Sequence, residues 1–346
     1  MNPDNRDHEV NENGSLGVSR ASDVDEGEDN DWSDTSSDIT EIDLDEIPTY
    51  FSERDGRLFH AHGSSPYPLY PLPVDAAEQN RINGQHGLLR ELIGRNYVGP
   101  VQEVLRPIPL SRQPRALDLG TGTGRWVLEM AAEFPHVHFK AVDIVPIATM
   151  HPPDNVDFEI HDINEEFRYE SGSFDLVHGR SISMAVHHYP DVIEKVARVL
   201  HPGGLFLACE WGRYPAMAGG VDPQRYLPHS QAFFRAIIDT LYRTRGIRPV
   251  ASRLEEYIES SGYFTNIRQR RFSVPIGPWH SDQRLQQIGA AYRDMVKVYA
   301  SSMSLMMVQA GESQTEVARL LQGYLYELDN VAGMVSHFYT VHAIRL

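Results

Sequence analysis

Three glycines that alternate with threonines follow a short apolar run in the segment 115–124. The residues after Gly124 have the composition of a helix, and an acid, Asp143, follows the next apolar run. A strand that leads into a glycine-rich turn and a helix, with an acid at the end of the next strand, is typical of the first crossover of a parallel α/β sheet. This feature predicts a Rossmann-like α/β fold with a cofactor site at the glycine turn.

The spacing of the glycines indicates which cofactor the turn suits. Dinucleotide sites use G-x-G-x-x-G, in which the third glycine lets helix and strand pack closely beside a pyrophosphate. Here the glycines are 120, 122 and 124, and Arg125 stands where that third glycine would be. A tight turn that leaves little room for a phosphate group favours an adenosine ligand that has no phosphate. We therefore expect S-adenosyl-L-methionine (SAM), and the spacing conflicts with a nicotinamide dinucleotide.

The order of the apolar and helical segments extends this prediction over the rest of the 346 residues. The sequence predicts strands at 115–119, 137–142, 156–160, 173–178 and 203–210, with helices at 124–134 and 190–200 between them. Because strands and helices alternate, we expect parallel strands joined by right-handed crossovers, with the ligand at the carboxyl ends of the strands. The remaining chain predicts helices at 229–244 and 251–261, a strand at 264–274, a helical stretch at 282–332 and a closing strand at 337–345. The two late strands predict an antiparallel pair at the sheet edge, with the helical insertion near the substrate mouth.

The net charge of −17 belongs mostly to the N-terminal segment. Residues 1–50 hold 16 of the 48 acids but only 2 of the 31 bases. Because this segment has few apolar residues before Ile39, we expect 1–47 to be a disordered acidic tail. Its end, 39–47, alternates apolar and acidic residues, which suits strand addition to a protein partner; a solvating tail without a partner is the alternative. The sign of the charge disfavours nucleic acid as a partner.

Between the tail and the sheet, residues 48–112 are expected to form an N-terminal cap over the site. The stretch 59–73 is rich in aromatic residues and proline and should be extended, because closely spaced prolines forbid a helix. Asp75 is a plausible N-cap for a helix that continues to about Asn96, with Leu88 and Leu89 on one face.

The remaining composition excludes several classes of protein. The single cysteine, Cys209, rules out a disulfide framework and favours a reducing compartment. No apolar run approaches transmembrane length and no signal peptide is recognisable, so we expect a cytoplasmic or nuclear protein without a membrane partner. The 16 histidines show no metal-ligand spacing, and we expect no metal site.

Several motifs, in the order in which they occur along the chain, resemble those of a known protein family. They are 117–126, Asp143-Ile-Val-Pro146, 153–160, 174–180 and 199–204. Together these motifs resemble a class I SAM-dependent methyltransferase, with 113–346 as the methyltransferase domain. The leader segments 70–75 and 78–86 are similar to those of the fungal LaeA-like group. The resemblance covers about residues 50 to 346 and omits the acidic tail.

The expected cofactor contacts lie at the carboxyl ends of the first strands. Asp118 would face the methionine part of SAM, Asp143 the two ribose hydroxyls and Asp162 the adenine amino group, with Ile163 against the adenine ring. The full expected set is Asp118, Gly120, Thr121, Gly122, Gly124, Asp143, Ile144, Asp162, Ile163 and His178. Loop capping is the alternative role for the three acids.

The acceptor side is less constrained, because methyl transfer requires orientation, exclusion of water and only sometimes a base. Candidate catalytic residues after the fourth and fifth strands are His187, His188 and Glu210. The histidines have helix capping or packing as an alternative. The methionines at 303–307 suit either an adaptable substrate pocket or the core.

These observations predict SAM-dependent methylation of a small molecule, in keeping with fungal secondary metabolism. The resemblance also implies a second function. LaeA-like proteins are associated with transcriptional control of metabolite clusters, so a SAM-binding regulator that acts through protein partners remains open. The tail 1–47 would be the partner-binding segment in that case.

Overall fold

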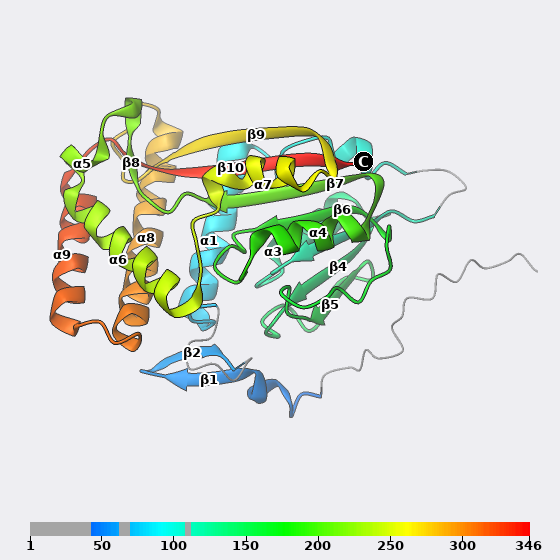
Figure 1. Ribbon diagram of the computed structural model, residues 1–346, viewed down its shortest axis with the longest axis horizontal. Coiled ribbons are helices and arrows are strands. Elements are labelled where there is room, and N and C mark those ends of the chain that lie inside the picture. Colours follow the sequence, from blue (N-terminus) through cyan, green and yellow to red (C-terminus); the bar gives the residue numbers. More distant parts are fainter. Residues whose placement is uncertain (1–42, 62–69, 108–111) are drawn as a thin grey trace, which may run out of the picture.

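The computed structural model describes residues 43–61, 70–107 and 112–346, and within them the fold is built on one large twisted sheet (Figure 1). The strand order is β5-β4-β3-β6-β7-β10-β8, with β9 paired to β10. Five neighbouring strands are parallel: β3 (Arg115–Leu119), β4 (His138–Asp143), β5 (Val156–Ile160), β6 (Phe174–Arg180) and β7 (Leu200–Trp211). The expected Rossmann-like sheet is confirmed, and all five strands fall within a few residues of their predicted positions.

The late strands form the antiparallel side of the sheet, as expected. β10 (Met334–Arg345) lies between β7 and β9 (Phe264–Pro275) and is antiparallel to both. The short β8 (Ala216–Met217) pairs with the beginning of β10.

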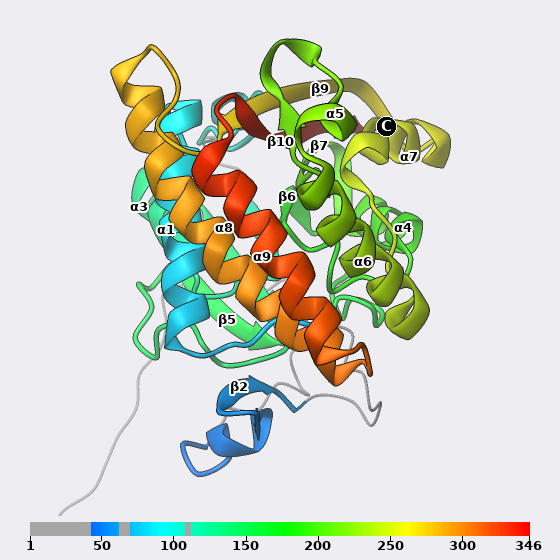
Figure 2. The same cartoon turned by 90° about the vertical axis from the view of Figure 1, so that its left-hand side faces the viewer.

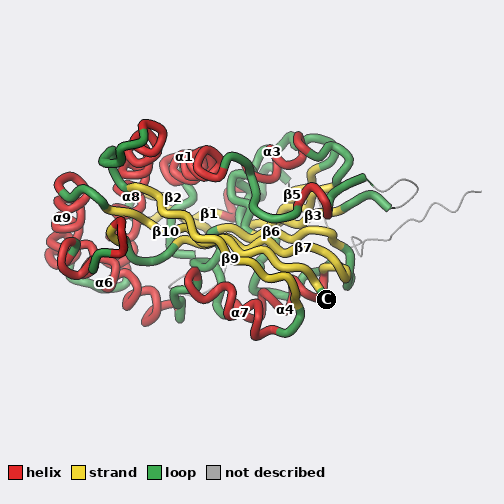
Figure 3. Tube along the Cα trace, turned by 90° about the horizontal axis from the view of Figure 1, so that it is seen from above, coloured by secondary structure: helices red, strands yellow, loops and turns green. Residues whose placement is uncertain are grey.

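Helices cover both faces of the parallel strands, as the view along the sheet shows (Figure 3). One face packs against α2 (Val101–Val104) and α3 (Arg125–Glu133), and the other against α4 (Tyr189–Val199), α7 (Leu254–Ser261) and the 3-10 turn η4 (Ala251–Arg253). Because side chains alternate along a strand, β3 sends Ala116 to the first core, and Leu117 and Leu119 to the second. The helix predicted at 251–261 is divided into the 3-10 turn η4 and the helix α7.

The helical insertion forms a third core beside the sheet. It consists of α8 (Gln283–Gln309) and α9 (Gln314–Asn330), which pack with α6 (Pro228–Arg245); Figure 2 shows them side by side. The helical insertion expected over 282–332 is present as two helices, because Gly311 (φ +89°) ends α8 and lets the chain reverse. Met303, Met306 and Met307 are buried in this core, so they pack rather than line a pocket. The short α5 (Pro223–Tyr226) and η3 (Ala218–Gly220) precede α6.

The N-terminal part holds one helix that was expected and one hairpin that was not. α1 (Ala76–Ile93) begins after Asp75, whose side chain accepts a hydrogen bond from the Glu78 N–H, and it ends at Gly94 in the left-handed conformation, before Asn96. The hairpin joins β1 (Phe51–Arg54) to β2 (Arg57–His60). Its turn residues Asp55 and Gly56 both have positive φ, as a type I′ two-residue hairpin turn requires.

The predictions for the acidic tail 1–47 and the extended segment 59–73 concern residues that are largely outside the described ones. Residues 1–42 and 62–69 are not described; residues 43–46 contain a turn and η2 (Ile47–Tyr50) is a 3-10 helix. In the described part of the chain, no helix has the length and apolar character needed to cross a membrane.

Candidate functional site

A cavity of about 650 Å³ opens at the carboxyl ends of the five parallel strands. Its wall combines the loops after β3, β4 and β5 with the loops after β6 and β7, and residues of α1 and α8 complete it. We call the part beside β3, β4 and β5 the cofactor half, and the part between β6, β7, α1 and α8 the acceptor half. The helix α1 lines the cavity, although the boundaries of an N-terminal cap at 48–112 stay a prediction.

The glycine turn forms the floor of the cofactor half. Gly120, Gly122 and Gly124 have φ of +64°, +59° and +73°, which other residues adopt only with strain. Gly120, Thr121 and Gly122 line the cavity, whereas Gly124 packs beneath it. A Cβ at Gly124 would lie 2.6 Å from Cζ of Phe158 on β5, so a side chain at this position would overlap that ring.

Asp143 ties the second strand to the glycine turn. Its Oδ2 accepts a 2.7 Å hydrogen bond from the Gly122 N–H, and its Oδ1 accepts a weaker one of 3.3 Å from the Val145 N–H. Asp143 and Ile144 both line the cavity. Burial raises the pKa of Asp143 to about 6, an effect that the backbone donors only partly oppose. Each carboxylate oxygen keeps a lone pair for a ligand hydroxyl.

The loop after β5 brings Asp162 and Ile163 to the same half. Asn164 fixes this loop, because its backbone N–H and its amide group both donate to Oδ1 of Asp162. Lys195 of α4 holds the loop from behind by donating to the carbonyl oxygens of residues 163, 164 and 165 at 3.3, 2.5 and 2.8 Å. The expected adenine-binding segment is therefore held by a buried lysine that sequence reasoning did not single out.

Two further side chains of the cofactor half present polar atoms without partners. Both ring nitrogens of His161 and the Oγ1 of Thr121 are buried and have no hydrogen-bond partner. Burial lowers the pKa of His161, which favours the neutral ring that can donate and accept at once. Unpaired buried polar atoms are costly, so these atoms suit a ligand that brings polar groups, as the adenosine part of SAM does. His161 directly precedes Asp162, the only signal by which it could have been found.

Asp118 and His178 lie one layer behind this wall. They are not among the described residues that line the cavity. Asp118 Oδ1 and His178 Nδ1 are 2.7 Å apart, and the imidazole stacks on Trp126 with ring centroids 3.7 Å apart. Their predicted contact with the cofactor stays a prediction; the observed contacts support the strand end and helix α3 that carry the glycine turn.

The candidate catalytic residues occupy three different environments. Glu210 is buried at the end of β7 and accepts hydrogen bonds of 2.8 to 2.9 Å from the Ile182 N–H, the Ser183 N–H and the Ser183 hydroxyl. Burial raises its pKa to about 7. His187 lines the cavity, and its backbone N–H donates to Oδ1 of Asn164. His188 is exposed, is paired with Asp191 at the start of α4, and is not among the described cavity residues.

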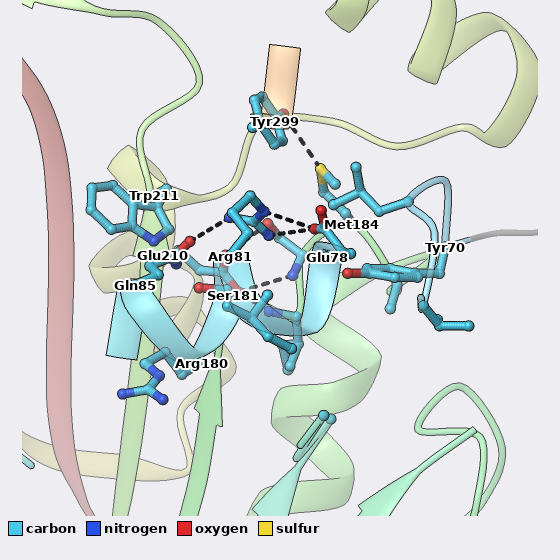
Figure 4. A pocket seen from close by; sticks show the side chains of 18 of the residues that line it. Tyr70, Glu78, Arg81, Gln85, Arg180, Ser181, Met184, Glu210, Trp211 and Tyr299 are labelled. Atoms are coloured by element: carbon cyan, nitrogen blue, oxygen red, sulfur yellow. Dashed lines mark hydrogen bonds and ion pairs between the residues drawn. The ribbon is translucent and has the colours of Figure 1, made fainter. Parts of the chain in front are cut away.

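The acceptor half also contains a group that the sequence did not indicate (Figure 4). Glu78 and Arg81 of α1 form a buried ion pair in which both the Nε and Nη2 of Arg81 donate to Oε1 of Glu78, at 2.8 and 2.6 Å. Aromatic rings surround this pair: Tyr70, Trp211, Tyr292 and Tyr299 all line the cavity.

Arg180, at the end of β6, also lines the cavity and contacts α1. Its Nη2 lies 3.0 Å from Nδ1 of His86, whose Nε2 lies 3.1 Å from a carboxylate oxygen of Glu129. Burial and the neighbouring Arg180 lower the pKa of His86 to about 4. A neutral His86 therefore accepts from Arg180 through Nδ1, whereas its Nε2 lies near Glu129 without a hydrogen bond to it. The Arg180 guanidinium keeps further donors for an anionic ligand group.

In the described residues, no group of three or more His, Cys, Asp or Glu side chains is placed to hold a metal ion.

Comparison with known proteins finds a methyltransferase-domain family and several fungal relatives. Residues 90–257 match the model of a methyltransferase domain. The secondary metabolism regulator laeA of Coprinopsis cinerea is 30% identical over 259 residues, which cover 72% of this chain and 63% of that protein. The methyltransferase pytC of Aspergillus terreus is 27% identical over 278 residues, covering 79% and 81%. The protein-methionine methyltransferase laeA of Emericella nidulans is 27% identical over 259 residues, covering 74% and 65%.

The matched length differs between these relatives. The chain spans less than two thirds of the two laeA proteins, at 63% and 65% of their length, and about four fifths of pytC, at 81%.

Proposed function

The chain carries a class I SAM-dependent methyltransferase domain of the LaeA-like group, and from this premise we propose that it transfers a methyl group from SAM to a small-molecule acceptor in fungal secondary metabolism. One observation carries the proposal. A single cavity of about 650 Å³ joins the glycine turn, Asp143 and Asp162 to an aromatic chamber between α1 and α8. Cofactor and acceptor sites must be continuous for direct transfer, because the reacting atoms have to meet.

SAM is the cofactor of this domain, and the residues of the cofactor half fit it. Asp143 would accept from both ribose hydroxyls, as acids at this position do in related sheets. His161 and Asp162 would contact the polar edge of the adenine, with Ile163 against its face. Arg180 would bind the carboxylate of the methionine part by charge-assisted hydrogen bonds. When bound, SAM supplies the electrophilic methyl group.

The chain's own contribution to the transfer would be orientation and exclusion of water. Glu210 holds the loop 181–183, because all three of its hydrogen bonds go to residues 182 and 183. That loop lines the cavity, and Ile182 lies against Gly120 of the glycine turn, so the position of the loop would affect how the acceptor meets the methyl group. His187 is the remaining candidate for receiving a proton, since it lines the cavity and is exposed.

A calorimetric titration tests the cofactor assignment. The full chain should bind SAM and S-adenosylhomocysteine but not NAD. Asp143→Ala should weaken SAM binding by about 1–3 kcal/mol, because it removes a charged acceptor from two hydroxyls. Asp157→Ala is the matched control, since Asp157 lies on the neighbouring β5 outside the described cavity lining and pairs with Lys140. A wild-type chain that binds neither sulfur ligand would refute the proposal.

A second candidate function is regulation through protein partners. The names of two relatives favour it, since both are called laeA and one is called a secondary metabolism regulator. In this reading the acidic segment 1–47 binds the partner and the protein acts in the nucleus, whereas the enzymatic reading requires only the cytoplasm.

Two measurements on the same preparation separate these functions. Transfer of the labelled methyl group from SAM into a small-molecule extract, retained after removal of residues 1–47, supports the enzyme. Capture of a defined partner that is lost with residues 1–47, together with SAM binding and no transfer, supports the regulator.

A further inference from the structure

We propose that the acceptor half binds a neutral, hydroxylated aromatic molecule, and that Glu78 determines this specificity. The inference deepens the proposed function and rests on it, because it names the class of acceptor for the same cavity. It depends on the buried Glu78–Arg81 pair and on the aromatic walls around it.

Only one of the two carboxylate oxygens of Glu78 accepts hydrogen bonds from Arg81. Oε1 of Glu78 receives both hydrogen bonds from Arg81, while the Nη1 of Arg81 donates to Oε1 of Gln85 at 2.7 Å. Oε2 of Glu78 is buried and has no hydrogen-bond partner, and the Glu78 residue is only 2% exposed. A buried carboxylate oxygen without a donor is costly, so a ligand that brings a donor to this point gains affinity.

The charge of the pair limits what that donor can be. Arg81 compensates the charge of Glu78, so the ion pair is neutral overall. An ammonium ligand beside it would therefore add an uncompensated positive charge at a buried site. A hydroxyl group gives the needed hydrogen bond without that cost. This balance favours a neutral donor over a cationic one.

The surrounding rings indicate the shape of the ligand. Trp211 and Tyr292 are stacked, with centroids 5.0 Å apart and planes 15° apart, and they form one wall. Tyr70 and Tyr299 lie near the ion pair, and the hydroxyl of Tyr299 donates to the sulfur of Met184 (Figure 4). Flat aromatic and thioether surfaces pack best against a planar apolar ring.

A second polar atom of the chamber has no partner. The indole Nε1 of Trp211 is buried and unpaired, and it can only donate. A ligand oxygen that accepts from it would complement the hydroxyl that donates to Glu78. The chamber therefore fits an aromatic ring that carries a hydroxyl group and a further oxygen atom.

Binding of small naphthalene probes to the full chain saturated with S-adenosylhomocysteine tests this inference. The probes are 2-naphthol, 2-methoxynaphthalene, which lacks the donor, and 2-naphthylmethylammonium, which is cationic. We expect 2-naphthol to bind at least about tenfold more tightly than either of the others, as one good hydrogen bond at a buried site allows.

Glu78→Leu combined with Arg81→Met removes the ion pair while keeping the volume apolar, a replacement that buried pairs often tolerate. In this variant the preference for 2-naphthol over 2-methoxynaphthalene should disappear. Glu91→Gln is the matched control, because Glu91 is an exposed carboxylate of the same helix, outside the described cavity lining. It should keep the wild-type preference.

The outcomes separate this inference from the proposed function. If the wild type does not bind S-adenosylhomocysteine, the proposed function fails and this inference falls with it. If it binds S-adenosylhomocysteine but no probe, prefers the ammonium probe, or keeps its preference in the double variant, the inference alone is overturned.

Discussion

The backbone N–H of Gly122 donates a 2.7 Å hydrogen bond to Oδ2 of Asp143, across the ends of the neighbouring strands β3 and β4. One carboxylate thus fixes the glycine turn and faces the cavity with its remaining lone pairs. The acid expected to bind the ribose is also the group that holds the turn in its binding conformation. The ionisation of Asp143 should therefore control the affinity for SAM.

The affinity for SAM should fall as the pH drops through about 6. The pKa of Asp143 is raised to about 6 by burial, so its carboxyl group is protonated below that pH and loses acceptor capacity. Calorimetric titrations between pH 5 and 8 measure this step, and Asp143→Asn should bind weakly with no step at pH 6. A wild-type affinity that is constant over this range would contradict the assignment.

Ionisation of Asp143 should lower the stability of the ligand-free protein, although it raises the affinity for SAM. Because the pKa of Asp143 in the folded chain lies above 3.8, the ordinary value for an aspartate, its contribution to stability is complete below pH 3.8 and is lost as the pH rises through about 6. Asp143→Asn should therefore gain stability relative to the ligand-free wild type between pH 5 and pH 8. Thermal melts without SAM measure the difference.

Gly124→Ala should cost stability and cofactor affinity together. Its φ of +73° strains any side chain, and the new Cβ would lie 2.6 Å from Phe158. We expect a loss of about 2–4 kcal/mol in the free energy of unfolding, from strain and overlap combined. Gly56→Ala is the control, because Gly56 has φ of +71° but open space around it, and it should lose only about 1 kcal/mol. Equal losses in chemical denaturation would contradict the close approach of turn and strand.

The cofactor half was largely predictable from the sequence because its elements are local. Each strand ends at a turn residue or an acid a few positions away, so β3, β4 and β5 could be placed with Gly120, Asp143 and Asp162 at their ends. Sequence periodicity carries this information directly. The position of Asp118 behind the wall was not predictable, because the face to which a side chain at a strand end turns depends on packing against α3.

The acceptor half was not predictable for a different reason. Glu78 of α1, Trp211 of β7 and Tyr299 of α8 are far apart in sequence and meet only because α1 packs against α8 over the strand ends. No motif connects them. The β1–β2 hairpin, in contrast, had a signal in Asp55-Gly56, a dipeptide typical of two-residue turns, and sequence reasoning missed it.

Lys195→Met should weaken SAM binding about tenfold and lower stability. The substitution keeps the apolar stem but removes the donor to three consecutive carbonyl oxygens behind Asp162 and Ile163. Buried carbonyls that lose a partner cost about 1–3 kcal/mol each, and the loop is expected to loosen. Lys297→Met is the control, since Lys297 makes a surface pair with Asp329 and should change stability by less than about 1 kcal/mol. Unchanged SAM affinity in Lys195→Met would show that the loop holds its shape without the lysine.

Glu210→Gln should distinguish a positioning role from a general base. Glu210 already accepts three hydrogen bonds from the loop 181–183, and glutamine keeps an acceptor oxygen for part of them. We therefore expect kcat/KM to fall by less than about tenfold, whereas loss of a general base typically costs about 10²–10⁴. Ser183→Ala removes one partner of the same carboxylate and should have an effect of similar size. A loss above about a hundredfold in Glu210→Gln, with Ser183→Ala near wild type, would instead make Glu210 the base, poised by its pKa of about 7.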